Sequence, residues 1–144
     1  VGSEMCIRDS LCSVGHEFGV TTGRKRRCGW LDMVALKYSI MINGVTQLIM
    51  MKSDVLDGFD TIKACVAYKK DGVVMEDMPF ETEGCEAVYK ELPGWKEDLS
   101  HMTDESQFPQ AFKDYIRFLE TELETPITIL SVGPDRAQTI VRKK

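Results

Sequence analysis

Residues 30–51 read WLDMVALKYSIMINGVTQLIMM and indicate the fold class. Spacings of three and four predict an amphipathic helix whose apolar face comprises Leu31, Val34, Ala35, Tyr38, Met41 and Ile42. Asp32 is expected in its first turn, favourable to the helix dipole, and Asn43-Gly44 supplies the left-handed residue that ends a helix. Residues 46–51 are a short apolar run that predicts a strand buried on both faces. A helix followed by a buried strand is typical of the α/β class.

An antiparallel element is expected in the middle of the chain. Residues 61–69 alternate apolar and polar side chains, and Lys70-Asp71-Gly72 leads into residues 73–75, which predicts a hairpin with a D-G turn. Residues 85–92 predict a further strand. Residues 96–108 are polar and without a period, so we expect a surface loop there.

The last third of the chain repeats the order of helix and buried strand. A long amphipathic helix is expected from Pro109 to the stop at Thr125-Pro126. Residues 127–132 then predict a second buried strand, which ends at Gly133-Pro134. Both buried strands end in polar or glycine loops, and open α/β sheets bind ligands at the carboxyl ends of their strands.

Composition limits the classes of partner. The net charge of -5 and the lack of aromatic residues among the cations argue against a nucleic-acid partner. No apolar run approaches the ~20 residues that span a bilayer, so no membrane partner is expected and a cytoplasmic location is predicted. The five cysteines include no C-x-x-C pair, which favours reduced thiols over a zinc site or a disulfide framework.

The densest anion-binding chemistry lies in residues 15–32, GHEFGVTTGRKRRCGWLD. Four consecutive cations, Arg24 to Arg27, follow a Thr-Thr-Gly turn whose hydroxyl and backbone N–H groups are further donors. The planar guanidinium fork suits carboxylate and phosphate groups. The residues alone leave two readings open, a site for a small anion and a solvated basic turn on an acidic protein.

Two further constellations follow the buried strands. In Lys52-x-Asp54 the carboxylate can accept hydrogen bonds from the N1–H and N2–H groups of guanine, while the lysine stem lies across the purine face. Residues 131–136, SVGPDR, offer a hydroxyl and backbone groups to the edge of a base. On the residues alone, a surface charge pair and a plain turn remain the alternatives.

The run at residues 15–32 resembles a signature segment of the adenylosuccinate synthetase family. MMKSDVLDG at residues 50–58 resembles the family's guanine-recognition segment, although Ser53 stands where many members carry an apolar residue. SVGPDRAQTI at residues 131–140 resembles the motif that completes the guanine pocket. GFDTIKACVAY and YKELPGWKED also look like family segments, so the resemblance extends over about residues 15–141.

The resemblance implies GTP-dependent ligation of IMP and L-aspartate to adenylosuccinate. GTP would phosphorylate O6 of the hypoxanthine ring, and the aspartate amine would then displace phosphate. The loop that closes over aspartate and IMP would comprise Val20, Thr21, Thr22, Gly23, Arg24, Lys25 and Arg26. Within it, Thr22 and Arg24 would hold aspartate, and Arg24 would also reach the IMP ribose. The GTP site would comprise Arg26, Lys52, Ser53, Asp54, Ser131, Val132 and Gly133.

The resemblance also implies a C-terminal portion, residues 11–144, of a mostly parallel-sheet, P-loop-like GTP-binding fold. The family's phosphate loop, Mg²⁺ ligands and catalytic Asp and His have no counterpart here, so no catalytic or metal-binding residue is expected in this chain. The full-length protein is expected to be a homodimer and this portion alone inactive. Residues 1–10, VGSEMCIRDS, resemble translated adapter sequence. The alternative is a free-standing guanine-nucleotide-binding or regulatory module.

Overall fold

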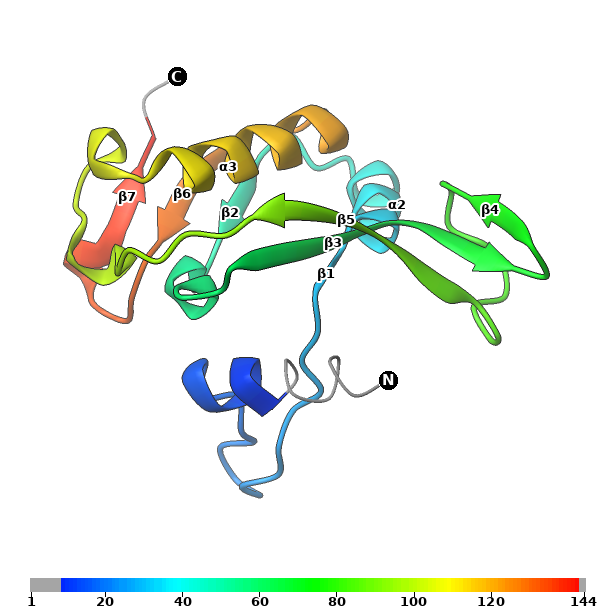
Figure 1. Cartoon of the computed structure of the whole chain (residues 1–144), viewed down its shortest axis with the longest axis horizontal. Coiled ribbons are helices and arrows are strands. Elements are labelled where there is room, and N and C mark those ends of the chain that lie inside the picture. The colour runs from blue at the N-terminus through cyan, green and yellow to red at the C-terminus, as the bar shows by residue number, and fades with distance from the viewer. Residues whose placement is uncertain (1–8, 143–144) are drawn as a thin grey trace.

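The computed structural model describes residues 9–142, which form two mixed sheets and two longer helices (Figure 1). The first sheet comprises β1 (Leu31–Asp32), β3 (Thr61–Lys70), β4 (Val73–Met75) and β5 (Glu86–Pro93). The second comprises β2 (Leu48–Met50), β6 (Ile127–Ser131) and β7 (Thr139–Val141). The pairs β1–β3 and β2–β6 are parallel, and the others are antiparallel. The expected α/β class is confirmed.

The antiparallel hairpin is confirmed as β3 and β4. Asp71 and Gly72 connect the two strands with φ angles of 51° and 83°. Positive φ at both central positions is the requirement of a tight two-residue hairpin turn, which Asp-Gly satisfies at low cost. The strand expected at residues 85–92 is β5, which pairs with β3 along most of its length.

Helix α2 (Met33–Asn43) ends as predicted but begins differently. Gly44 closes it in the left-handed region at φ 60°. The predicted helical start was wrong, because Leu31 and Asp32 form β1, opposite Ala64 and Cys65 of β3. Asp32 is therefore the N-cap residue, and its carboxylate accepts a hydrogen bond from the backbone N–H of Ala35 at 3.0 Å.

The predicted apolar face of α2 was wrong toward the end of the helix, where the side chains of Tyr38, Met41 and Ile42 are exposed. Val34 is buried as predicted, and so is Met33, which was not assigned to that face. Apolar residues occur on several sides of this helix, so spacing alone could not determine which side packs against the core.

Strand β2 is more exposed than its sequence indicated. Within residues 9–142 it pairs only with β6, so it forms an edge of its sheet. Ile49 is 56% exposed, which contradicts the expected burial on both faces. Strand β6 matches its prediction better, since Ile127, Leu130 and Ser131 are buried. The antiparallel strand β7 beside it was not predicted.

Helix α3 (Gln110–Leu123) was predicted correctly and supplies much of the core. Its buried side chains are Phe112, Tyr115, Ile116, Leu119 and Leu123. They pack with residues of both sheets, including Ile62, Ala64 and Leu130. Burial of each large apolar side chain stabilises the fold by about 1.5–3 kcal/mol. Because this face of α3 packs against residues of both sheets, it stabilises their association.

The segment 96–108 is less superficial than predicted. It contains two short 3-10 turns, η2 (Leu99–His101) and η3 (Glu105–Gln107), and buries Leu99 and Phe108 in the core. The carboxylate of Asp57 fixes its beginning, accepting hydrogen bonds from Trp95 Nε1 at 2.6 Å and from the backbone N–H of Leu99 at 2.9 Å. Trp95 is itself almost fully buried, so Asp57 joins two parts of the core.

Residues 9–29 form an arm that projects from β1 away from the two sheets (Figure 1). Its first residues, 9–14, are helical, and the remainder is a loop that contains several turns. Among the described residues Cys12, Cys28, Cys65 and Cys85 are free thiols, and Cys6 lies outside that range. Across residues 9–142, no helix has the length and apolar character needed to cross a membrane.

Candidate functional site

The parallel pairing of β2 with β6 brings two of the sequence-predicted constellations together. Met50 lies opposite Leu130, so the residues that follow each strand leave the sheet at the same edge. The 3-10 turn η1 (Ser53–Leu56), which follows Lys52, contacts β6, the strand that ends at Ser131. This edge is where open α/β sheets bind ligands.

The turn after β2 holds polar atoms without partners. Lys52 has a left-handed backbone, with φ 55°, which is uncommon for a residue with a side chain. Behind it, Ser53 Oγ and Asp54 Oδ1 are buried and accept or donate no hydrogen bond within the described part of the chain. Buried polar atoms are normally paired, so the Asp54 oxygen is an unsatisfied hydrogen-bond acceptor in this turn.

The turn after β6 is fixed by its own hydrogen bonds. Ser131 Oγ donates to the backbone carbonyl of Gly133 at 2.9 Å. The backbone N–H of Val132 donates to the backbone carbonyl of Gln138 at 3.0 Å. A Cβ atom at Gly133 would collide with the side-chain amide of Gln138. Glycine therefore allows the backbone to approach Gln138 closely, and the half-exposed backbone of Gly133 forms the surface of the turn.

The basic loop forms a narrow hairpin at the end of the arm. Phe18 and Lys25 form an antiparallel bridge, and the backbone N–H of Gly19 donates to the carbonyl of Arg24 at 2.8 Å. Gly23, at φ 63°, turns the chain at the tip. The tip residues are exposed, and Val20 is 98% exposed. Arg24 makes no side-chain hydrogen bond or ion pair to any residue within 9–142, so its guanidinium fork faces solvent.

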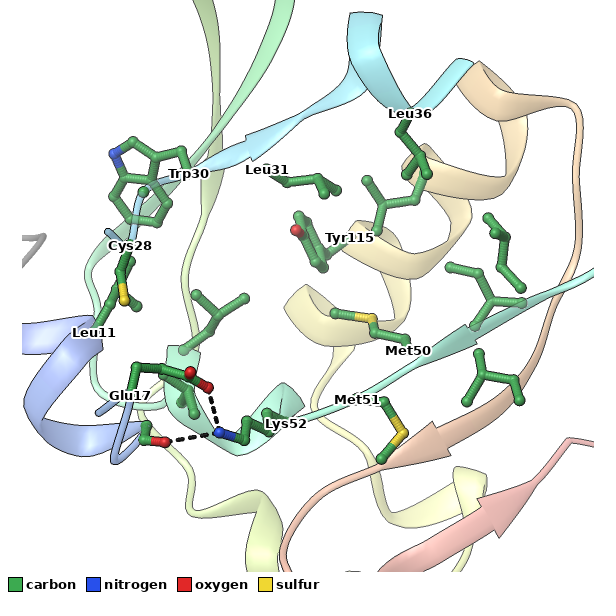
Figure 2. A pocket seen from close by; sticks show the side chains of 18 of the residues that line it. Leu11, Glu17, Cys28, Trp30, Leu31, Leu36, Met50, Met51, Lys52 and Tyr115 are labelled. Atoms are coloured by element: carbon green, nitrogen blue, oxygen red, sulfur yellow. Dashed lines mark hydrogen bonds and ion pairs between the residues drawn. The ribbon is translucent and has the colours of Figure 1, made fainter. Parts of the chain in front are cut away.

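Glu17 connects the loop to the turn after β2 (Figure 2). Its carboxylate pairs with Lys52 Nζ through Oε1 and with Arg26 NH1 through Oε2, the latter at 3.0 Å. Lys52 Nζ also donates to the backbone carbonyl of Gly15 at 2.8 Å. The hydrogen bond from Lys52, together with that from Arg26, holds the pKa of the Glu17 carboxyl below its usual value against the opposing effect of burial.

An apolar cavity of about 530 Å³ lies between the arm, β2 and α3 (Figure 2). Tyr115 points into it from α3, and Met50 faces it from β2. Its charged lining residues are Glu17, Arg27 and Lys52. Trp30 also lines it, and its indole Nε1 is buried without a partner in the described residues. In residues 9–142 no group of three or more His, Cys, Asp or Glu side chains could hold a metal ion.

The family model for adenylosuccinate synthetase matches residues 3–140. The chain belongs to the adenylosuccinate synthetase family. The match begins within residues 1–10, whose non-native origin remains a prediction.

Several relatives have the same family name. The adenylosuccinate synthetase of Bacteroides thetaiotaomicron is 66% identical over 135 residues, which cover 93% of this chain and 32% of the relative. That of Phocaeicola vulgatus is 66% identical over 137 residues, which cover 94% of this chain and 31% of the relative. This chain therefore spans about a third of the length of the curated adenylosuccinate synthetases that it matches.

A solved structure has the same fold as this chain. The fully ligated adenylosuccinate synthetase of Plasmodium falciparum matches with a TM-score of 0.91 and 39% sequence identity. The match covers 96% of this chain and 34% of that one. The described fold is thus one that adenylosuccinate synthetases adopt over about a third of their length.

Sequence reasoning missed two residues that shape the site. Glu17 is the only acidic residue between Gly15 and Leu31, a stretch with four cations, and that isolation was a usable signal. For Gln138 the usable signal was its spacing from Asp135, since D-x-x-Q is a capping-box pattern. Its side-chain Oε1 accepts from the backbone N–H of Asp135 at 2.8 Å. Its Nε2 donates to the carbonyl of Ser100 at 2.9 Å, a long-range contact that no local pattern contains.

Proposed function

We propose that this chain is the C-terminal portion of an adenylosuccinate synthetase and that the full-length protein ligates IMP and L-aspartate in a GTP-dependent reaction. One observation carries the proposal. A carboxylate oxygen of Asp54 is buried and unpartnered among the described residues, in a turn that contacts β6, the strand that leads to Gly133. Glu17 links Lys52, which precedes that turn, to Arg26 of the basic loop. This arrangement would put a base-binding site next to an anion-binding loop, as the ligation of a nucleotide with an amino acid requires.

The guanine base of GTP would bind at the strand ends. Asp54 would accept hydrogen bonds from N1–H and N2–H, the donor pair that adenine lacks. The ammonium of Lys52 is already engaged by Glu17 and Gly15, which leaves its methylene stem to lie across the purine face. Ser53 is buried and would support the turn that presents Asp54.

The opposite edge of the base would meet the turn after β6. Ser131 and Val132 are buried, with their hydroxyl and N–H groups committed to the turn itself. They would fix the backbone of Gly133 at the base, so that this part of the pocket recognises shape and backbone polarity.

Loop residues 20–26 would close over aspartate and IMP. Thr22 and Arg24 would bind the aspartate carboxylates, with Arg24 also reaching the IMP ribose, because its guanidinium has no competing partner in the described residues. Arg26 uses NH1 for Glu17 and would present the rest of its fork to the GTP phosphates. Val20, Thr21, Gly23 and Lys25 would form the frame of the loop. The exposure of the tip supports a segment that covers a ligand.

In the proposed reaction, the residues of this chain would position the substrates and supply positive charge. Phosphoryl transfer to O6 of IMP and displacement of that phosphate by the aspartate amine both develop negative charge that fixed cations stabilise. The described residues do not fit Mg²⁺, since they contain no cluster of metal-binding side chains. The proposal therefore assigns Mg²⁺ binding, the phosphate loop and the catalytic Asp and His to the rest of a cytoplasmic, homodimeric protein.

Two measurements test this assignment. The genomic sequence upstream of Leu11 should continue in frame into a Gly-rich phosphate loop, whereas a start codon close to Leu11 would favour a free-standing guanine-nucleotide module. Calorimetric titration of the full-length protein with GTP and with ATP should give at least tenfold tighter binding of GTP. Equal affinities would reject the guanine site.

A further inference from the structure

We propose that Glu17 is a positioning residue that couples the base-binding lysine, Lys52, to the anion-binding arginine, Arg26. This inference rests on the proposed function. It assigns a role to a residue outside both predicted binding sets. Glu17 would make closure of the loop depend on the occupancy of the base site, so that GTP and aspartate strengthen one another's binding.

The first support is the geometry of the carboxylate. Each of its two oxygens binds a different cation, Lys52 after β2 and Arg26 in the loop. Figure 2 shows the contact with Lys52. The Glu17 side chain is 23% exposed, whereas those of Lys52 and Arg26 are 54% and 58% exposed. The shared anion is thus the less exposed member, and each cation keeps an open side for a ligand.

The second support is how firmly the backbone of Glu17 is held. Its N–H donates to the carbonyl of Cys12 at 2.9 Å, and its carbonyl accepts from the backbone N–H of Arg26 at 2.9 Å. Glu17 therefore lies at the base of the loop hairpin, where both strands are joined. If the Glu17 carboxylate shifts, the hairpin should therefore shift with it.

The third support is backbone conformation on both sides of the contact. His16 and Lys52 have φ angles of 50° and 55°, in the left-handed region that side chains rarely adopt. Such conformations persist where the surrounding contacts impose them and are frequent at ligand-binding sites. Lys52 and Asp54 are close in sequence, so a displacement of Lys52 should also move the Asp54 carboxylate, which would bind guanine.

The Glu17 ion pairs are expected to change ligand affinity only modestly. Exposed ion pairs contribute little individually, and two such pairs on one carboxylate would change ligand affinity by about three- to tenfold. Coupling is reciprocal, so the factor by which GTP tightens aspartate must equal the factor by which aspartate tightens GTP. This reciprocity separates a coupling role from simple support of one site.

The test uses the full-length protein and its Glu17→Ala and Glu17→Gln variants. Calorimetry in the presence of IMP, with GDP as a nucleotide that cannot react, gives the Kd for aspartate without and with saturating GDP and the Kd for GDP without and with saturating aspartate. In the wild type each Kd should fall about three- to tenfold on saturation with the other ligand, and the two ratios should be equal. In Glu17→Ala both ratios should fall to about one, with kcat at saturating substrates reduced less than threefold. Glu17→Gln, which keeps one acceptor, should lie between them.

The matched control is Glu91→Gln, which breaks the comparable exposed ion pair with Lys63, 2.9 Å long, on the β3–β5 ribbon. It should retain both wild-type ratios. Wild-type ratios in Glu17→Ala, or a change in only one of them, would overturn the coupling role. A stability effect alone would lower the amount of folded enzyme without changing either ratio.

A readout without turnover separates this inference from the proposed function. Hydrogen exchange of residues 19–25 should slow when GTP is added to the wild type and should not respond in Glu17→Ala. A protein that makes adenylosuccinate but shows the same GTP response in both forms would retain the proposed function and refute the coupling. A wild type that neither binds GTP nor makes adenylosuccinate would refute both.

Discussion

Met50 of β2 lies directly opposite Leu130 of β6 in a parallel pair. The relationship has a functional consequence, since it brings the residues after both strands, around Lys52 and Ser131, to one edge of the sheet. The candidate guanine site is therefore formed from segments about eighty residues apart in sequence.

Replacement of Arg24 by Leu should reduce kcat/KM for aspartate about 10- to 100-fold in the full-length protein. The variant removes a charge-assisted hydrogen-bond donor whose guanidinium is otherwise unpaired. The Kd for GTP should change less than twofold. Steady-state kinetics and calorimetry measure the two effects. Arg117→Leu, on the exposed side of α3, is the matched control, and ordinary aspartate kinetics in Arg24→Leu would remove Arg24 from the substrate loop.

Replacement of Asp54 by Asn should reduce the preference for GTP over inosine triphosphate, which lacks the 2-amino group. The amide offers one acceptor in place of two carboxylate oxygens, so about 10-fold or more of the discrimination should disappear. Competition of the two nucleotides measures it. Asp60→Asn, at an exposed carboxylate paired with Lys96, should discriminate as the wild type does. Unchanged discrimination in Asp54→Asn would exclude the guanine contact.

Replacement of Gly133 by Ala should destabilise the protein by about 1–3 kcal/mol, because the new methyl group displaces the Gln138 side chain and its two hydrogen bonds. Urea unfolding measures the effect. Gly29→Ala, where a methyl group would meet open space, should be nearly neutral. Addition of Gln138→Ala to Gly133→Ala should cost less than the sum of the single changes, and strict additivity would contradict the collision.

Replacement of Asp57 by Ala should destabilise the protein by about 2–4 kcal/mol, since Trp95 Nε1 and the backbone N–H of Leu99 would lose their acceptor. The exposed Asp77→Ala variant should be nearly neutral. Denaturant unfolding distinguishes them. Equal unfolding free energies for the two variants would show that the hydrogen bonds from Trp95 and Leu99 to Asp57 do not stabilise the fold.

Asp57 also gives a dependence on pH. Burial raises the pKa of its carboxyl, although the hydrogen bonds from Leu99 and Trp95 oppose the shift. A raised folded-state pKa contributes stability that is present below the unfolded value, about 4, and is lost as pH rises through the folded value. The unfolding free energy of the wild type should therefore fall relative to that of Asp57→Asn across this window. A constant difference would contradict the shift.

The elements most visible in the sequence were those with local signals. Gly44 ends α2 as its sequence indicated, and Asp71-Gly72 forms the predicted hairpin turn. Helix α3 has one apolar face and was predicted throughout its length. The start of α2 was misread because the pairing of Leu31 with Ala64 is a long-range contact that no local pattern contains.

The candidate site was predictable to a similar extent. Family resemblance indicated Arg24, Lys52 and Asp54, and the parallel pair β2–β6 adds their physical setting. Burial was harder to predict, since Ile49 is apolar yet lies on an edge strand. Glu17 acts through a contact to Lys52 across 35 residues of sequence, and only the folded chain shows that contact.

The decisive measurement is product formation by the full-length protein that contains this sequence. Incubation with GTP, IMP, L-aspartate and Mg²⁺, followed by chromatography, should yield adenylosuccinate and GDP in equal amounts. Omission of aspartate should abolish the adenylosuccinate. Consumption of GTP without adenylosuccinate, or no reaction in a folded protein that binds GTP, would contradict the assignment of this chain to an active synthetase.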